Sequence, residues 1–285
     1  MQTLKLTSKS VTKETKVIQI SDAHIIVPDK NDGEIYKIEK ERKLFFERES
    51  LLRTGEVRYA EEELAEAIEY AKSADLTVFT GDIVEFATQT NVDRMMKHFA
   101  NCKNYLYTFG NHDYLKCYLN AENPEKQRAE NGAMFRKVIK NDIEFTVKNV
   151  NGINIVVMDN STCQFSERQY EELKKVLSED NDAILFMHMP LYHPALDIIG
   201  QKKVNVIAVA CGVNYDLSSP KYPTETTKKT IELIKENHKK VLALMTGDQH
   251  YTARIMYYEN IIECICAPTY LHDFYEIVIS REKAE

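Results

Sequence analysis

An α/β fold is predicted for this chain of 285 residues, and two observations support it. Short apolar runs that end in polar residues recur along the sequence, and amphipathic helical segments lie between several of them. Strands that alternate with helices form a core in which ligands gather beyond the carboxyl ends of the strands. The composition is that of an ordinary globular protein, since 44% of the residues are hydrophobic and 28% are charged.

The predicted strands are short apolar runs bounded by turn residues, which is typical of strands buried on both faces. They comprise residues 16–20, 76–80, 105–109, 153–158, 183–187 and 241–246. Polar residues follow the runs in this order: Ser21-Asp22, Gly81-Asp82, Gly110-Asn111, Asp159-Asn160, His188 and Gly247-Asp248. Polar groups therefore fall where an α/β sheet would hold a ligand.

Three segments have the apolar spacing of an amphipathic helix, namely residues 60–71, 166–177 and 224–238. The second of these opens with Ser166 and Gln169 in the spacing of a capping box, which marks a helix N-terminus. Helices between apolar strands complete the alternation that predicts the α/β core.

The C-terminal part and two other segments depart from this alternation. Residues 252–258, 260–267 and 274–280 are β-rich and follow in quick succession, which predicts an antiparallel meander. Two insertions are expected: residues 30–55 are charged and partly helical, and residues 191–223 are long, irregular and rich in Tyr and Pro. Because no low-complexity tract or linker marks a boundary, a single domain over residues 1–285 is expected.

Charge and cysteine usage limit the partners and the compartment. The net charge of −7 argues against non-specific electrostatic binding of long nucleic acid, although a local metal centre could still attract a phosphate. The N-terminus lacks an apolar signal region and no apolar stretch approaches a membrane span, so we expect a cytoplasmic protein without membrane contact. The cysteines are scattered and are expected to be buried free thiols in a reducing compartment: Cys102, Cys117, Cys163, Cys211, Cys264 and Cys266.

Two stretches repeat an Asp-x-His spacing, Asp22 with His24 and Asp248 with His250. In an extended chain, residues two apart point the same way, so each pair could grip one ion. Asp82 follows Gly81 at another strand end. Taken alone, these features are explained better by a plain turn or helix cap and by a surface or hydrogen-bonded histidine.

The stretch from Gly110 to Asp113 is more specific, because it crowds Asn111, His112 and Asp113 at one strand end. An asparagine carbonyl can ligate a metal without adding charge, and a neighbouring histidine can remain free to move protons. His188 ends a further strand. Since all these strand ends meet at one rim of a sheet, the groups together predict one metal site.

This ordered set, Asp-x-His, Gly-Asp, Gly-Asn-His-Asp, His and Gly-x-x-His, resembles the calcineurin-like metallophosphoesterase superfamily from Asp22 to His250. The resemblance implies a four-layer αββα sandwich, with two mixed β-sheets flanked by helices and two divalent metal ions at one edge. It also implies a first metal held by Asp22, His24, Asp82 and His250. Asp82 would bridge to a second metal, which Asn111, His188 and the residue at position 248 would complete.

The sequence departs from the superfamily at its last motif, where Gly-Asp-Gln-His replaces the usual Gly-His-x-His. An Asp in place of a His would shift metal preference toward Mn²⁺ or Mg²⁺ relative to Zn²⁺. Among Mn, Fe, Zn and Mg, manganese is therefore favoured. Asp248 can ligate the second metal directly, ligate it through a water, or have a purely structural role.

The expected reaction is hydrolysis of a phosphoester bond in a small phosphorylated substrate by a metal-activated hydroxide. His112 would act as general acid toward the departing alkoxide, and Asp113 would either orient its imidazole or close the turn. His193 either contacts substrate or belongs to the surface of its loop. One alternative is a phosphodiesterase or nuclease that acts on nucleotides or nucleic acid. The other is a non-catalytic binding or scaffold protein that retains the fold, and the departure from the motif at Asp248 is the feature that supports it. The sequence does not indicate an oligomeric state.

Overall fold

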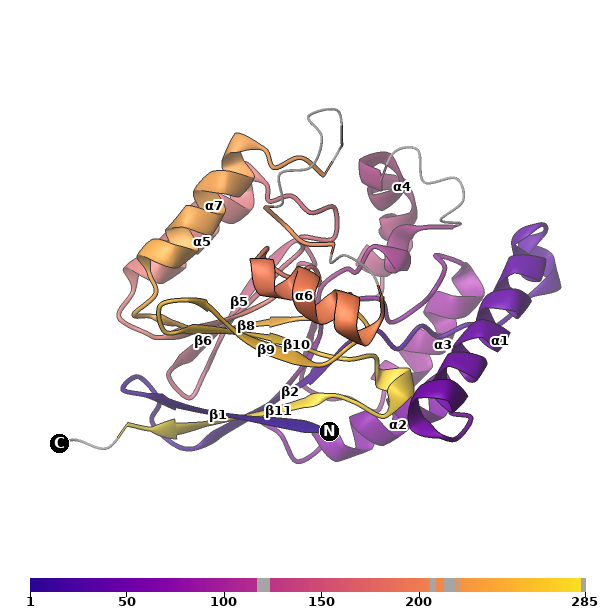
Figure 1. Ribbon diagram of the computed structural model, residues 1–285, viewed down its shortest axis with the longest axis horizontal. Coiled ribbons are helices and arrows are strands. Elements are labelled where there is room, and N and C mark those ends of the chain that lie inside the picture. The colour runs from indigo at the N-terminus through magenta and orange to yellow at the C-terminus, as the bar shows by residue number, and fades with distance from the viewer. Residues whose placement is uncertain (117–123, 206–208, 213–218, 220, 283–285) are drawn as a thin grey trace.

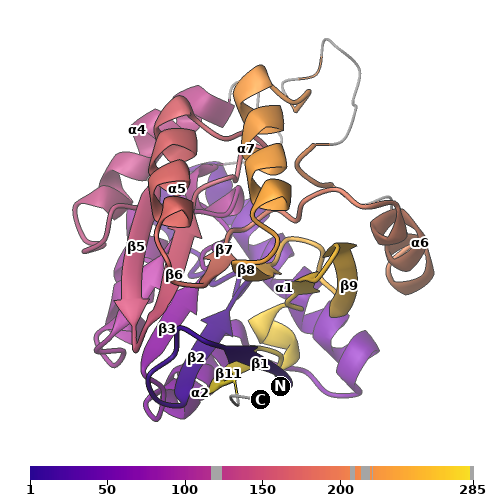
Figure 2. The same ribbon diagram turned by 90° about the vertical axis from the view of Figure 1, so that its left-hand side faces the viewer.

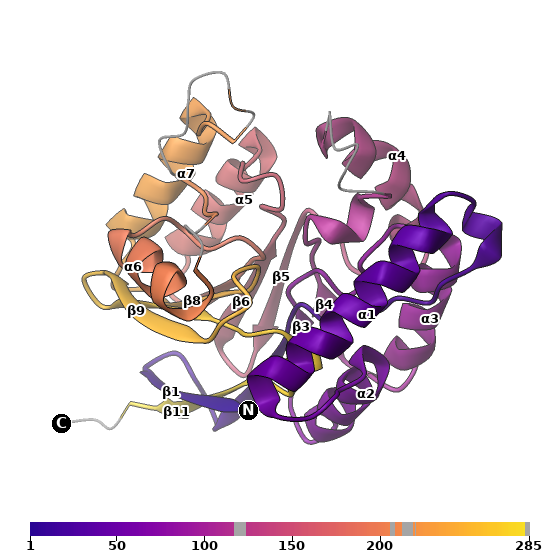
Figure 3. The ribbon, with the colours of Figure 1, turned by 45° about the vertical axis from the view of Figure 1, so that its right-hand side comes forward.

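Two mixed β-sheets pack face to face between two sets of helices in the computed structural model, which describes residues 1–116, 124–205, 209–212, 219 and 221–282. Figure 3 places the sheets between α5, α6 and α7 on one side and α1, α2 and α3 on the other. The predicted α/β four-layer sandwich is therefore confirmed. The first sheet has the order β1 (Gln2–Ser8), β11 (Tyr275–Arg281), β2 (Thr15–Ile20), β3 (Leu76–Phe79) and β4 (Tyr105–Tyr107). The second has the order β5 (Phe145–Val150), β6 (Ile153–Met158), β7 (Ala183–Phe186), β8 (Val241–Thr246), β10 (Ile261–Ile265) and β9 (Ala253–Tyr258).

The inner faces of the two sheets form one apolar cluster. Val17 and Val78 of the first sheet pack in it with Ile155, Ile184 and Met245 of the second, and all five side chains are fully buried. Helices bury the outer faces, so central strands are apolar on both sides. This is why they appear in the sequence as continuous apolar runs rather than alternating ones.

The helices cover the outer faces of the sheets. Against the first sheet lie α2 (Ala60–Ala71), α3 (Gln89–Phe99) and α4 (Pro124–Arg136), with α1 (Ile35–Thr54) beside them. Against the second lie α5 (Glu167–Ser178) and α7 (Glu225–Glu236), which pack side by side in Figure 2, and α6 (Pro194–Lys203). Short 3₁₀ turns are η1 (Lys30–Asp32), η2 (His112–Tyr114) and η4 (Thr269–Leu271).

The locally encoded elements agree with their predictions. The six predicted apolar runs coincide with β2, β3, β4, β6, β7 and β8, and the three predicted helices coincide with α2, α5 and α7. Ser166 caps α5 in the predicted box, because its hydroxyl accepts from the Gln169 N–H while the Gln169 side chain accepts from the Ser166 N–H. These signals depend only on neighbouring residues, so the elements can be predicted from the sequence.

The predicted C-terminal meander is wrong. β9 and β10 do pair antiparallel, but β10 also pairs parallel with β8, and β11 leaves for the other sheet. There β11 lies between β1, to which it is parallel, and β2, to which it is antiparallel, so the first and last strands of the chain lie side by side (Figure 1). β11 alternates buried and half-buried residues, and such a pattern identifies a strand without identifying its partner.

Both expected insertions contain a helix. Residues 30–55 form η1 and α1, and residues 191–223 contain α6, which has Pro194 at its first turn. Within the second segment, residues 206–208, 213–218 and 220 lie outside the described residues, as does Cys117. The other five cysteines are buried and free, as predicted. Across the described parts of the chain, no helix combines the length and apolarity needed to cross a membrane.

Candidate metal centre

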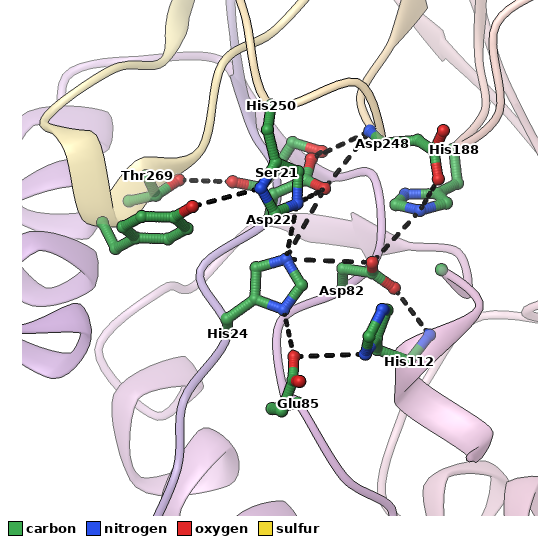
Figure 4. A network of polar contacts seen from close by, with 12 residues as sticks. Ser21, Asp22, His24, Asp82, Glu85, His112, His188, Asp248, His250 and Thr269 are labelled. Carbon is green, nitrogen blue, oxygen red and sulfur yellow. Dashed lines mark hydrogen bonds and ion pairs between the residues drawn. The ribbon is translucent and has the colours of Figure 1, made fainter. Parts of the chain in front are cut away.

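The loops after five strands converge on one edge of the two sheets, where they bring polar side chains together (Figure 4). Gln19 joins the sheets at this edge, since its amide donates 3.0 Å hydrogen bonds to the Thr80 hydroxyl and to the Thr246 carbonyl. The residues gathered there are those predicted as metal ligands: Asp22, His24, Asp82, Asn111, His188, Asp248 and His250.

Asp22, His24 and His250 form one group. The Nε2 atoms of His24 and His250 lie 3.1 Å apart, and they lie 3.9 and 3.7 Å from Asp22 Oδ1. One ligand atom from each residue lies within 4.8 Å of the others, close enough to hold one ion. Asp22 and His24 are buried, so water does not compete for their donor atoms.

A second group surrounds His188. Its Nε2 lies 3.2 Å from Asn111 Oδ1, 3.4 Å from Asp82 Oδ2 and 3.6 Å from Asp248 Oδ1. Asp82 Oδ2 is also 3.9 Å from His24 Nε2, so this carboxylate lies between the two groups. Asp248 therefore lies beside His188, within reach of the same ion.

The backbone of these loops is held in an unusual conformation. Five of the seven residues have positive φ angles, between 49° and 64°: Asp22, His24, Asp82, Asp248 and His250. This left-handed region costs a residue other than glycine roughly 1–3 kcal/mol, and residues held there cluster at functional sites. The surrounding hydrogen bonds must therefore stabilise a geometry that the isolated loops would not adopt.

Glycine permits two of the close approaches in these loops. A Cβ on Gly110 would collide with the Asp82 carboxylate, and one on Gly247 would collide with the Ser21 hydroxyl and the Asp22 carboxylate. Both glycines therefore let a neighbouring strand end bring its carboxylate into the site.

Asp113 closes the turn, which decides between the two roles that the sequence left open. Its buried carboxylate accepts backbone N–H bonds from Gly110 and Asp82 at 2.8 Å, from Ile83 at 3.0 Å and from Val84 at 3.1 Å. A buried carboxylate with several backbone donors is a strong, directional connection. Asp113 thereby locks the loop after β4 onto the loop after β3.

Glu85 is a site residue that the sequence prediction missed. Its buried carboxylate places Oε2 2.7 Å from His24 Nδ1 and 3.1 Å from His112 Nδ1, while Oε1 lies 2.6 Å from Arg42 Nε (Figure 4 shows the two histidine contacts). Glu85 thus orients both imidazoles. The available signal was a carboxylate three residues after Asp82, in the stretch from Thr80 to Phe86.

His112 lies over the site without joining either ligand group. Burial lowers the pKa of His112, but the negative charges of Glu85 and Asp82 outweigh burial and raise the pKa to about 10. Its backbone N–H donates to Asp82 Oδ1 at 2.8 Å, and its side chain keeps 19% exposure. The imidazole therefore carries a proton at neutral pH in the metal-free protein and can reach a molecule from solvent.

The contacts of the ring nitrogens test whether metal ions fit the site. His24 Nδ1 donates to Glu85, His188 Nδ1 donates to the Thr80 carbonyl at 2.8 Å, and His250 Nδ1 lies 3.1 Å from the Tyr270 hydroxyl. With each Nδ1 directed outward, the Nε2 atoms face the carboxylates and are the positions where a metal ion could bind. The Nε2 atoms of His24 and His250 lie 3.1 Å apart and both lie near Asp22 Oδ1, so one cation could accept both lone pairs.

The charges of the site agree with this interpretation. Burial, together with the charge of Asp82, raises the pKa of Asp22 to about 6. Burial lowers the pKa of His188, yet Asp82 and Asp248 outweigh it and hold the pKa well above its ordinary value. Burial and the neighbouring His24 lower the pKa of His250. An excess of negative charge at the site explains why His188 retains a proton beside crowded carboxylates. Divalent cations would take the place of that proton. The imidazole and carboxylate donors suit first-row transition metals.

Two further residues near the rim support the loops. The Asn160 side-chain carbonyl accepts from the backbone N–H groups of His188 and Met189, and its amide donates to the Met189 carbonyl. His193 is the N-cap of α6, where its Nδ1 accepts from the Ala195 N–H at 3.1 Å. Asn160 thus positions the His188 loop, whereas His193 stabilises a helix start and its contact with substrate stays a prediction.

The fold and the site together define a metal-binding α/β protein of the four-layer class. Residues 15–215 match the family model described as calcineurin-like phosphoesterase, so the chain belongs to the calcineurin-like metallophosphoesterase family, whose members are metal-dependent phosphoesterases. That match ends before Asp248 and His250, which the structure brings to the same site.

Solved structures share the fold at low sequence identity. A dimetal phosphatase from Danio rerio superposes with a TM-score of 0.54 and 14% identity, with 91% of each chain covered. A purple acid phosphatase from yellow lupin (Lupinus luteus) seeds superposes with a TM-score of 0.55 and 13% identity, over 90% of this chain and 44% of the lupin chain. No curated protein matches the sequence significantly.

Proposed function

We propose that this metallophosphoesterase hydrolyses small phosphoesters, monoesters above all, with two divalent metal ions. Asp22, His24 and His250 would hold the first ion, and Asn111, His188 and Asp248 the second, with Asp82 shared between them. The convergence of the His24, His188 and His250 Nε2 atoms on buried carboxylates carries this proposal.

When bound, two such ions would supply Lewis acidity toward the phosphoryl oxygens and lower the pKa of a water nucleophile. The chain supplies the rest. His112 donates its proton to the departing oxygen of the ester, and Glu85 holds the ring by its Nδ1 so that Nε2 remains available. Asp113 keeps the loops that carry Asp82 and His112 at a constant separation.

A small substrate agrees with the charge of the protein. The net charge of −7 would repel an extended polyanion, whereas a single phosphate can be held by the local charge of the metal centre. The five buried free thiols support a reducing compartment such as the cytoplasm.

A substrate panel tests the proposed function. Metal-free protein should be inactive, and added Mn²⁺ should restore hydrolysis of p-nitrophenyl phosphate at a higher kcat/KM than that of bis-p-nitrophenyl phosphate, cyclic nucleotides or oligonucleotides. The rates follow from release of p-nitrophenol or of nucleotide. A preference for the diesters would identify a phosphodiesterase instead, and no turnover at full metal occupancy would support the scaffold alternative.

Asp248→His should change metal preference more than fold stability. The substitution exchanges an anionic oxygen for an imidazole nitrogen beside His188 Nε2, which favours Zn²⁺ relative to Mn²⁺. We expect the ratio of Zn²⁺ to Mn²⁺ affinity to rise on the order of tenfold, the scale of changes around metal ligands. Isothermal titration of metal-free protein with each ion measures this ratio, and Asp180→His in an exposed turn is the matched control. Identical ratios in the two variants would argue against ligation by Asp248.

A further inference from the structure

Helix α1 directs one stripe of side chains at the candidate metal centre. Arg42, Phe46 and Glu49 occupy positions i, i+4 and i+7, so they share a face of the helix. That face packs toward η4, which carries Tyr270. Figure 3 shows α1 running along the outside of the helical layer of the first sheet.

The first connection from this stripe reaches His24. Arg42 Nε donates to Glu85 Oε1 at 2.6 Å, and Glu85 Oε2 lies 2.7 Å from His24 Nδ1. Glu85 is fully buried, so its position depends on the groups that contact its two oxygens. Arg42 thus acts on a candidate metal ligand through one intervening carboxylate.

The second connection reaches His250. The Tyr270 hydroxyl donates to Glu49 Oε2 at 2.7 Å and lies 3.1 Å from His250 Nδ1. Because the single hydroxyl proton is directed to Glu49, the oxygen is free to accept the Nδ1 proton of His250. Glu49 therefore determines the direction of the bond that sets the His250 tautomer.

Phe46 packs between these two connections. Its ring stacks on His24, with centroids 4.8 Å apart and an angle of 26° between the planes, and it lies 4.8 Å from the Tyr270 ring. Phe46 is also the one large apolar side chain that α1 buries among the described residues. A helix that packs against an apolar core usually buries a wider apolar stripe than this. The buried apolar side chain of α1, Phe46, instead packs against His24.

We propose that α1 is a positioning element for the first metal site, and that it raises metal affinity by holding the His24 and His250 rings in their ligating tautomers and orientations. This inference rests on the proposed metal function. Outer hydrogen-bond partners of metal-ligating histidines commonly contribute 10- to 100-fold in affinity, through ring orientation and ligand basicity. Arg42 and Glu49 would do so from a segment outside the strand ends that carry the ligands.

Titration of metal-free protein with Mn²⁺ tests the proposal by isothermal calorimetry. Glu49→Ala and Tyr270→Phe should each weaken one of the two sites by roughly 10- to 100-fold and leave the other unchanged. Glu49→Gln keeps an acceptor for the Tyr270 hydroxyl, so it should recover most of the lost affinity. Glu41→Ala, on the exposed face of the same helix, is the matched control and should bind as the wild type does.

Thermal unfolding of the metal-free variants separates positioning from general stability. An unchanged midpoint with selective loss of one site supports the proposal. Equal weakening of both sites with a lowered midpoint, or unchanged affinity in Glu49→Ala and Tyr270→Phe, overturns it while the proposed function stands. If the wild-type protein itself bound no Mn²⁺, Zn²⁺ or Mg²⁺, the metal centre and this inference would fail together.

Discussion

Asp82→Asn is expected to abolish metal-dependent phosphoester hydrolysis and to lower the metal content of the protein. Asp82 Oδ2 lies 3.4 Å from His188 Nε2 and 3.9 Å from His24 Nε2, so it lies between the two ligand groups and we propose that it serves both ions. Asparagine removes the negative charge and leaves one acceptor oxygen where two ions need ligands. Because the substitution would remove several kcal/mol of transition-state stabilisation, kcat should fall by roughly 10³-fold or more.

Plasma mass spectrometry for bound metal and steady-state assays with p-nitrophenyl phosphate measure the two effects of Asp82→Asn together. Asp180→Asn, in an exposed turn, makes the same chemical change away from the site and should behave as the wild type does. Full occupancy by two ions and an unchanged kcat in Asp82→Asn would show that the shared-ligand assignment is wrong.

His112→Ala has the second-largest expected effect, a fall in kcat of about 10²- to 10⁴-fold, which is the usual contribution of general acid catalysis. The metal content should remain that of the wild type, because His112 pairs with Glu85 and joins neither ligand group. In the metal-free protein the charges of Glu85 and Asp82 raise the pKa of His112 to about 10 against the opposing effect of burial, so the imidazole holds a proton at neutral pH.

Comparing substrates with different leaving groups tests the role of His112 more specifically than the overall rate of His112→Ala does. A departing alkoxide needs a proton more than p-nitrophenolate does, so the variant should lose more activity toward an alkyl phosphate than toward p-nitrophenyl phosphate. His238→Ala, which removes a half-buried histidine that bonds to Asn260, is the control. An equal loss on both substrates, with metal retained, would indicate that His112 binds substrate without donating a proton.

The strands that carry the site could be predicted because their signals are local. β2, β3, β7 and β8 are apolar runs with turn residues at their ends, and both features depend on a few neighbouring residues. The same holds for the Ser166 cap of α5. Parallel strand ends meet at one edge of a sheet, so donor residues at those ends could be expected to share one site.

The partners of the outer strands could not be predicted, because pairing acts between segments that are distant in the chain. β11 aligns Tyr275 with Gln2 and with Gln19, whereas proximity in sequence favoured a meander with β9 and β10. Glu85, Phe46 and Tyr270 were missed for the same reason, since their contacts with His24 and His250 join segments that are distant in the chain.

The sequence by itself determined which donor groups the protein has and which strand ends carry them, because residue type and local apolar pattern are properties of short segments. Only the tertiary structure decided that the Nε2 atoms of His24 and His250, 226 residues apart in the chain, oppose each other at 3.1 Å. It also assigned turn closure to Asp113 and imidazole orientation to Glu85. Distances of this kind follow from how sheets and loops pack together, and packing depends on contacts among many distant residues at once.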